Sequence, residues 1–550
     1  MRSPFRLLLK LFQDRFFEND TVSPGGGFQT SIHQVFGFLI TIGLVVGYIA
    51  LPQFLALALR PVTPQTSWGF RVLWLGLSAY SFGVAGFAAV FYWDTLFPDR
   101  RDFLILAPFP IRLAELMAAK FLALMRFLFL LVLAINAVPD LLFLVVMLVP
   151  KARGAGLHLV VAQMAATWGA SIFGFLAVAA LEGVLIAITS ISVFRRISPW
   201  VQMAGMSLMV LSLLGFLFYG PLFPFELLAR HAWIYAFPPV WFSGLYELMS
   251  GGSNRLLASL GMLGIQATAI AVVVLLLSWG LGFRRHFRRT LESEDAPHRP
   301  RAWSTPNWYL KTPEERAVLG FIAKTLSRSS KHQFFLAGYL SAGISVAAFF
   351  AAAIRGARLV VSEDGARAAS FVLGFFLISG FRAVFQFPAE LGANWIFRLT
   401  EARWTEVSRA AARRFVLAVS VVLLLILALP LEVSLWKWPV ILEHCASGFL
   451  ASALLVEALF WNFDKVPFTC SFFPGRTSLA LLVVLYVYGI TGYSFNMADV
   501  ERAMERQPAL MLLIFPAGIT ALILAWRRRS GEEAVRFDGS EPVIQTLSLD

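Results

Sequence analysis

Apolar runs of about twenty residues recur along the whole length of this 550-residue chain. A run of this length spans the hydrocarbon core of a bilayer, and a helix satisfies its own backbone hydrogen bonds there. The composition agrees, because 58% of the residues are hydrophobic and only 14% are charged. A soluble protein of this size carries about 25% charged residues. The predicted fold class is therefore an all-α polytopic membrane protein.

We expect about twelve spans, arranged as two pseudo-symmetric six-helix halves. The expected spans are 32–58, 72–93, 113–149, 159–193, 199–223, 256–283, 334–354, 368–387, 410–431, 440–463, 478–496 and 508–526. The third run is interrupted near Asn136, Pro139 and Asp140, which predicts one span with a bent extension. The fifth is expected to begin at Ser198-Pro199, since serine caps helices and proline suits the first helical turn.

Two amphipathic segments and one hairpin complete this layout. Phe5–Phe17 has its apolar residues on one helical face, which favours a helix lying along the membrane surface over an ordinary solvated helix. Pro313–Ser327 is a possible second surface helix, and Pro224–Gly252 is an aromatic segment broken by prolines, typical of a re-entrant hairpin. The predicted organisation is a surface helix and linker at 1–31, the first half at 32–283, a cytoplasmic linker at 284–333, the second half at 334–528 and a polar tail at 529–550.

Two polar segments between spans are too charged for lipid. Phe97–Phe121 and Phe387–Phe415 both open with Phe-Pro, carry acids and arginines, and run into a new apolar helix. A segment repeated in this way predicts a docking surface at the membrane face. The alternative is charge that only sets topology and caps helices.

Basic residues alternate between the loops in a way that sets orientation. Lys and Arg cluster in the loops that include both polar segments and the 284–331 stretch, so these loops and both termini are expected in the cytoplasm. The net charge of +13 then reflects topology and contact with anionic lipid, and no nucleic-acid partner is expected. The expected location is a bacterial inner membrane.

The layout resembles the membrane permease subunit of a type-2 ABC exporter, with two six-span halves fused in one chain. Phe5–Phe17 is similar to that family's elbow helix, and Pro224–Trp241 to its outer hairpin. The first polar segment is similar to its coupling segment through Asp102, Leu106, Pro108, Pro110, Arg112, Glu115 and Lys120. The second copy lacks the Leu-Pro core, which implies two unequal docking sites.

This resemblance implies a transport subunit rather than an enzyme. It would be driven by two copies of a separate ABC ATPase, which would carry the ATP and Mg. No further permease chain would be needed, because the halves are fused. The chain itself contains no Walker A motif and no cofactor is expected in it. The residues implied in docking are Asp99, Arg100, Arg101, Asp102, Phe103, Leu104, Arg112, Glu390, Arg398, Glu401 and Arg403.

Charges within apolar runs are costly and usually face the bundle interior. Arg126 and Glu182 are expected at similar depths and would form a buried pair, while Glu457 would meet Arg382, Arg413 or Arg414. An alternative function is an ion-coupled secondary transporter that uses Glu182 and Glu457. A membrane enzyme acting on lipid ranks last, because the two cysteines and seven histidines show no catalytic or metal-ligand spacing. The loop Lys465–Gly475 reads as a simple tight turn.

Overall fold

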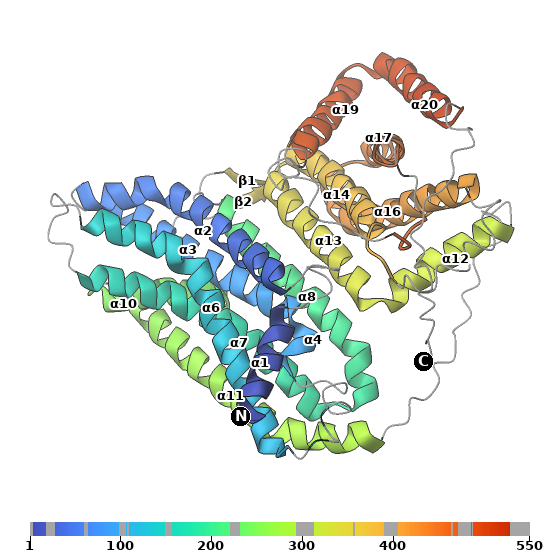
Figure 1. The fold of residues 1–550 in the computed structure, drawn as a ribbon. Coiled ribbons are helices and arrows are strands. Elements are labelled where there is room, and N and C mark those ends of the chain that lie inside the picture. Colours follow the sequence, from blue (N-terminus) through green and yellow to red (C-terminus); the bar gives the residue numbers. More distant parts are fainter. Residues whose placement is uncertain are drawn as a thin grey trace, which may run out of the picture. The chain divides into compact units, whose positions relative to one another are not determined.

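The structure is a computed structural model, and it is almost entirely helical (Figure 1). It describes residues 4–17, 28–59, 64–97, 106, 109, 111–148, 157–219, 232–252, 254–292, 313–355, 358–389, 405–461, 463, 466–470, 486 and 488–527. By their contacts these residues fall into two compact units, 1–297 and 298–550. The boundary lies inside the expected linker.

The first unit consists of helices. They are α1 (Pro4–Phe17), α2 (Phe28–Leu59), α3 (Pro64–Phe91), α4 (Trp93–Leu96), α6 (Leu113–Met147), α7 (Leu157–Ile188), α8 (Ile191–Tyr219), the 3-10 helix η2 (Ala232–Ala236), α10 (Pro238–Met249) and α11 (Arg255–Glu292). The expected helix at 5–17 is confirmed as α1, its place at the membrane surface stays a prediction, and α6 begins at Leu113 as expected. Helix α11 continues nine residues beyond the expected end at Phe283, into the expected linker.

The second unit adds one short hairpin to its helices. Its elements are α12 (Pro313–Arg328), α13 (Ser330–Ala351), β1 (Ala352–Arg355), β2 (Arg358–Val361), α14 (Glu363–Val384), α16 (Thr405–Leu435), α17 (Trp438–Leu459), the π-helix η5 (Ile490–Phe495), α19 (Asn496–Arg506), η6 (Pro508–Leu510) and α20 (Met511–Arg527). The two strands pair antiparallel, with Ala352 opposite Val361. This hairpin was not predicted from the sequence.

Ten helical stretches in the described part of the chain are long and apolar enough to cross a membrane. They lie in α2, α3, α6, α7, α11, α13, α14, α16, α17 and the stretch of η6 and α20. The architecture is therefore that of a multi-pass helical membrane protein. The fifth expected span falls in α8, which is not among the ten, and most of the eleventh lies outside the described residues. Twelve spans stay a prediction.

The expected start of the fifth span was wrong. Helix α8 begins at Ile191, where the Ser190 hydroxyl accepts a bond from the Val193 amide at 3.4 Å, and Pro199 lies inside the helix. Ser198 does not cap; its hydroxyl accepts a hydrogen bond from the Trp93 indole at 3.0 Å. The prediction that 113–149 forms one helical stretch is confirmed, since α6 runs through Pro139 to Met147.

Several helix contacts within the first unit recur within the second. In the first unit α1 packs on α6, α10 packs on α3 and α7, and α11 packs on α7. In the second unit α12 packs on α16, α19 packs on α14 and α17, and α20 packs on α17. Each unit thus holds a surface helix against its third long helix and a short helix against its second and fourth. The units differ elsewhere, because α2 packs mainly on α6 whereas α13 packs mainly on α14.

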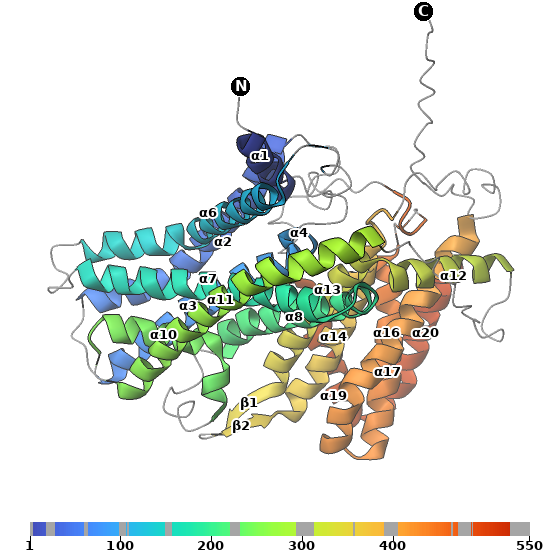
Figure 2. The same cartoon turned by 90° about the horizontal axis from the view of Figure 1, so that it is seen from below.

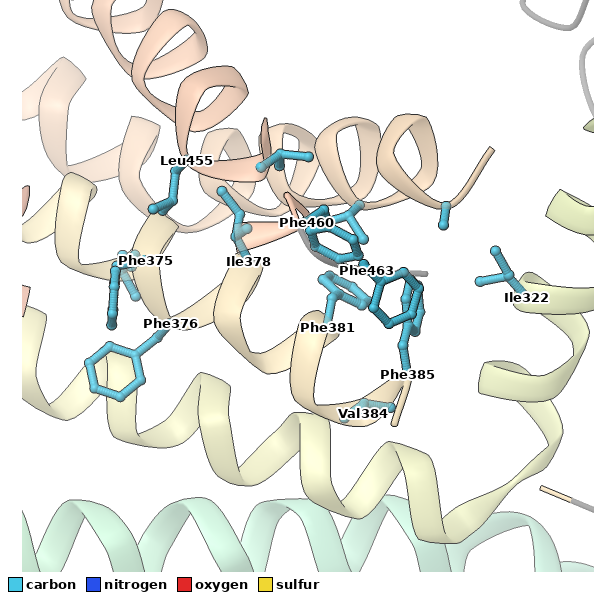
Figure 3. Packing of buried hydrophobic residues seen from close by; sticks show 14 of the residues in the cluster. Ile322, Phe375, Phe376, Ile378, Phe381, Val384, Phe385, Leu455, Phe460 and Phe463 are labelled. Carbon is cyan, nitrogen blue, oxygen red and sulfur yellow. The ribbon is translucent and has the colours of Figure 1, made fainter. Parts of the chain in front are cut away.

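Aromatic side chains fill the core of the second unit at one end of α14. Figure 3 shows Phe381 of this helix and Phe385, just after its end, gathered with Phe460 and Phe463, which follow α17. The Phe385 ring lies 6.1 Å from the Phe460 ring and 6.3 Å from the Phe463 ring. This packing fixes the end of α14, from which the second polar segment leaves.

Helix α10 lies against α11 through two glycines (Figure 2). A Cβ atom on Gly244 would collide with the Leu257 carbonyl oxygen and lie 2.8 Å from the Gly261 amide nitrogen. Small residues let helix backbones approach this closely in membrane proteins. The expected re-entrant hairpin is thus, in its described part, a helix packed into the bundle.

We expect Gly244→Ala to lower the free energy of unfolding by about 1–3 kcal/mol, because the added methyl has no space. The measurement is reversible denaturation of the full chain in detergent, followed by tryptophan fluorescence. Gly280→Ala on α11 is the matched control: its Cβ would meet nothing within 4 Å, so stability should stay equal or rise by up to about 1 kcal/mol. Equal effects of the two substitutions would contradict the close approach.

Candidate functional site

The first polar segment starts at the end of α4 and is described at its two ends. Asp99, Arg100, Arg101, Asp102, Phe103 and Leu104 lie outside the described residues. Phe97 is buried, and its ring packs 4.9 Å from the Trp279 ring of α11. Phe121, at the other end, packs 5.6 Å from the same Trp279 ring. Both ends of the segment therefore lie against one tryptophan.

Lys120 joins three elements at this point. Its ammonium nitrogen donates a hydrogen bond to the Phe97 carbonyl oxygen at 2.9 Å, and it lies 5.2 Å from the centre of the Phe12 ring of α1. The residue is 4% exposed. A buried ammonium is costly unless its charge is compensated, and a carbonyl oxygen and an aromatic face both do so. Lys120 thus ties the surface helix α1 and the start of the polar segment to α6.

The last part of the first segment is exposed. Arg112 precedes α6, and its carbonyl oxygen accepts a bond from the Glu115 amide at 2.9 Å. The Glu115 carboxylate in the first turn suits the positive end of the helix dipole. Phe109 exposes 57% of its surface.

The second polar segment is described only at its start. Glu390, Arg398, Glu401 and Arg403 lie outside the described residues. The Phe387 carbonyl oxygen lies 3.1 Å from Nε2 of His332. Since a carbonyl oxygen only accepts, Nε2 carries the proton, and Nδ1 accepts from the Ser329 hydroxyl at 2.6 Å. The buried His332 therefore holds the start of this segment.

The loop 465–475, which the sequence predicts as a simple tight turn, also holds the start of the second polar segment. In its described part, 466–470, every residue is buried. Phe468 has a positive φ of 67°, and its amide donates to the Phe385 carbonyl oxygen at 3.0 Å. Its own carbonyl oxygen accepts from the Ala389 amide at 3.0 Å, and its ring packs 6.0 Å from Phe321 of α12. The loop clamps the second segment beside α12.

The same device thus occurs in both units. In each, the carbonyl of the phenylalanine before proline contacts a buried side-chain nitrogen, from Lys120 or His332. In each, that side chain lies next to the surface helix or to a residue packed on it. The Phe-Pro pair was visible in the sequence, but its two partners were not, because each is reached only through tertiary packing.

The expected pair between Arg126 and Glu182 does not form. Arg126 is exposed, and its guanidinium donates to the side-chain oxygen of Gln13 at 3.2 Å, whereas Glu182 is buried. The error arose because equal depth in two helices does not determine which way each side chain faces. Arg126 faces α1, which covers this part of α6.

The expected pairing of Glu457 is confirmed with one of its three candidates, Arg413, at 3.5 Å. Arg414 instead contacts Glu315 of the surface helix α12 at 2.8 Å. Arg382 donates to the Leu459 carbonyl oxygen at 2.9 Å and lies 4.7 Å from the centre of the Phe463 ring. The described contacts of these residues are those of helix packing.

The first unit also contains a buried carboxylate that was not predicted as a site from the sequence. Asp140 on α6 accepts hydrogen bonds from Gln163 at 3.1 Å, from Thr167 at 3.4 Å and from the Trp168 indole at 2.9 Å, all on α7. Asp140 is 7% exposed. Asp140 marked only an interruption in the apolar run, because its three partners lie more than twenty residues away in sequence.

A second buried polar cluster joins four helices of the second unit. Nδ1 of His444 on α17 lies 2.8 Å from the Glu501 carboxylate of α19, and Nε2 lies 3.3 Å from Glu432 of α16. The Ser370 hydroxyl of α14 donates to the Glu432 carboxylate at 2.9 Å. An imidazole that faces carboxylates with both nitrogens matches the imidazolium form, which has two donors. We call these four residues the His444 cluster.

The described residues contain no group of three or more His, Cys, Asp or Glu side chains arranged to hold a metal ion. Comparisons with protein-family models, curated proteins and solved structures found no match to this chain. The class defined by the fold is a multi-pass helical membrane protein. Its function is therefore argued from its own geometry.

Proposed function

We propose that this chain is the membrane permease subunit of an ABC-type exporter, built from two six-helix halves and driven by a separately encoded ATPase. The observation that carries the proposal is the repeated anchoring of the two Phe-Pro segments, by Lys120 in one unit and His332 in the other. A segment that transmits force from a partner must be held firmly to the helices that move.

The shared helix contacts support the two-half arrangement. Each unit packs a surface helix on its third long helix and a short helix on its second and fourth. Charge that serves topology alone requires no such anchoring, since it acts during insertion and not in the folded protein. The exposed Phe109 gives the first segment an apolar contact point among its charges.

The ATPase would bind at the cytoplasmic face, where the basic loops are expected. Asp99, Arg100, Arg101, Asp102 and Arg112 would pair with charges of the partner, with Phe103 and Leu104 as apolar anchors. In the second half Glu390, Arg398, Glu401 and Arg403 would take this part. ATP and Mg would be bound by the partner alone.

The test is co-purification of ATPase activity with the tagged full chain from its native membrane. We expect the double reversal Arg101→Glu and Asp102→Lys to remove at least about nine-tenths of that activity, because several interface charges then repel. Reversal of Arg195 and Arg196, a basic pair expected on the same face, is the matched control and should retain it. Equal loss or equal retention in both variants would rule out docking through this segment.

The described contact of Glu457 gives the ion-coupled alternative no specific support, because this carboxylate meets Arg413. Transport that persists after the proton and sodium gradients collapse, and that stops when ATP is removed, would separate the two functions.

A further inference from the structure

A pocket opens beside the His444 cluster, between α14, α16, α17 and η5 of the second unit. It is an open pocket with a cavity volume of about 50 Å³. Most of its wall is apolar, with Phe371, Leu424, Ala428 and Phe449 among the lining residues. Polar groups line it at Glu432, His444, Ser370, Cys445, Ser452 and Tyr493. The pocket is thus an apolar chamber with a carboxylate in its wall.

Glu432 has one carboxylate oxygen to spare. Its contacts within the described chain all reach Oε1, which accepts from Ser370 at 2.9 Å and lies 3.3 Å from His444. The residue is 4% exposed and lines the pocket. Oε2 is not among the fully buried side-chain oxygens without a partner, so it is reached from the open pocket. Oε2 is therefore available to a donor that enters the pocket.

The surrounding charge favours a cationic donor. The imidazolium of His444 faces two carboxylates, Glu432 and Glu501, both almost fully buried. Arg367 is the next positive charge, and it is ion-paired with Glu505 at 2.6 Å. These five groups carry three negative and two positive charges. The carboxylates around His444 thus outnumber the positive groups.

We propose that this pocket binds an amphipathic ammonium ion, with an N–H group on Glu432 Oε2 and an apolar chain along Phe371, Leu424 and Phe449. A bare metal ion fits poorly, because both nitrogens of His444 already face carboxylates and the other walls are apolar. A charge-assisted hydrogen bond in a low-dielectric site binds tightly, and the apolar wall accounts for the chain. This inference stands apart from the proposed function, since it requires no ATPase.

The test measures equilibrium binding of radiolabelled dodecylamine to the full chain in phosphatidylcholine nanodiscs, with protein-free nanodiscs subtracted. This amine is an ammonium ion at about pH 7. We expect Glu432→Gln to weaken binding by about tenfold or more, through loss of the charged acceptor. Glu457→Gln on α17 is the matched control, because Glu457 pairs with Arg413 and does not line the pocket. It should bind as the unchanged protein does.

A second variant leaves the charges intact. Gly448 lines the pocket, and a Cβ atom there would meet nothing within 4 Å, so Gly448→Leu should fill the space, preserve the fold and abolish binding. Dodecanol, equal in length but neutral, should not compete. Binding that is absent in the unchanged protein, undiminished in both Glu432→Gln and Gly448→Leu, or equally displaced by dodecanol would overturn the proposal.

Two further arms identify the source of the ammonium. Phosphatidylethanolamine presents an N–H ammonium on a lipid, whereas phosphatidylcholine has no N–H group. Displacement of the probe by added phosphatidylethanolamine would identify a lipid headgroup as the natural ligand. Undiminished probe binding in its presence would identify a free amphiphilic amine.

Discussion

Replacing His444 with leucine is expected to lower the free energy of unfolding by about 3–5 kcal/mol, the largest effect we foresee for one side chain. The substitution leaves Glu432 and Glu501 facing each other across a buried site without the imidazolium between them. Breaking a buried ionic cluster by removing one member costs far more than its net contribution, because the remaining charges stay desolvated.

The measurement is detergent-phase denaturation followed by tryptophan fluorescence. Trp436 is a local reporter, since its ring lies 5.2 Å from the His444 ring. Asp499→Ala, on the same helix as Glu501, is the control: its pair with Arg502 is exposed and should contribute less than about 1 kcal/mol. Adding Glu432→Gln and Glu501→Gln to the leucine variant should recover most of the loss. A loss no larger than that of the control would show that the cluster is not charged as described.

The sequence predicted the elements of this fold better than their contacts. Apolar length identified the ten long apolar helices, because the bilayer demands about twenty such residues from each one. The start of α8 was missed because Ser198-Pro199 has the chemistry of a helix cap, while Ser198 in fact bonds to Trp93. The β-hairpin at 352–361 was missed because eight strand residues leave a weak periodic pattern.

The same difference between predicted elements and unpredicted contacts holds for the candidate site. The Phe-Pro pair at the start of each polar segment could be recognised in the sequence, because it occurs in both segments. Lys120 was noted only as a motif position and His332 only as a scattered histidine, because their partners depend on packing across the unit. The His444 cluster joins residues from four helices, at positions 370, 432, 444 and 501, and no local spacing reports such a set.

The second large expected effect is a local increase in amide exchange when Lys120 is replaced. Lys120→Met retains the length of the side chain but removes the donor to the Phe97 carbonyl and the charge over the Phe12 ring. A hydrogen bond from a charged group contributes about 1.5–3 kcal/mol, so amide exchange in α1 and around Phe97 should speed up about 10–100-fold. Exchange in the second unit should not change. Lys10→Met, an exposed lysine on α1, is the matched control and should leave exchange as it is.

His332→Leu makes the corresponding change in the second unit, and comparison of the two variants tests whether the anchors are equivalent. The imidazole holds Phe387 as a neutral donor and the loop at Phe468 supports the same segment, so the second unit has two supports. We therefore expect His332→Leu to speed exchange around Phe387 less than Lys120→Met does around Phe97. Equal acceleration at both sites would mean that the Phe468 clamp adds nothing. A larger acceleration in the second unit would show the opposite order. The segment at Phe387, which lacks the Leu-Pro core, would then be the less firmly held of the two once its side-chain anchor is removed.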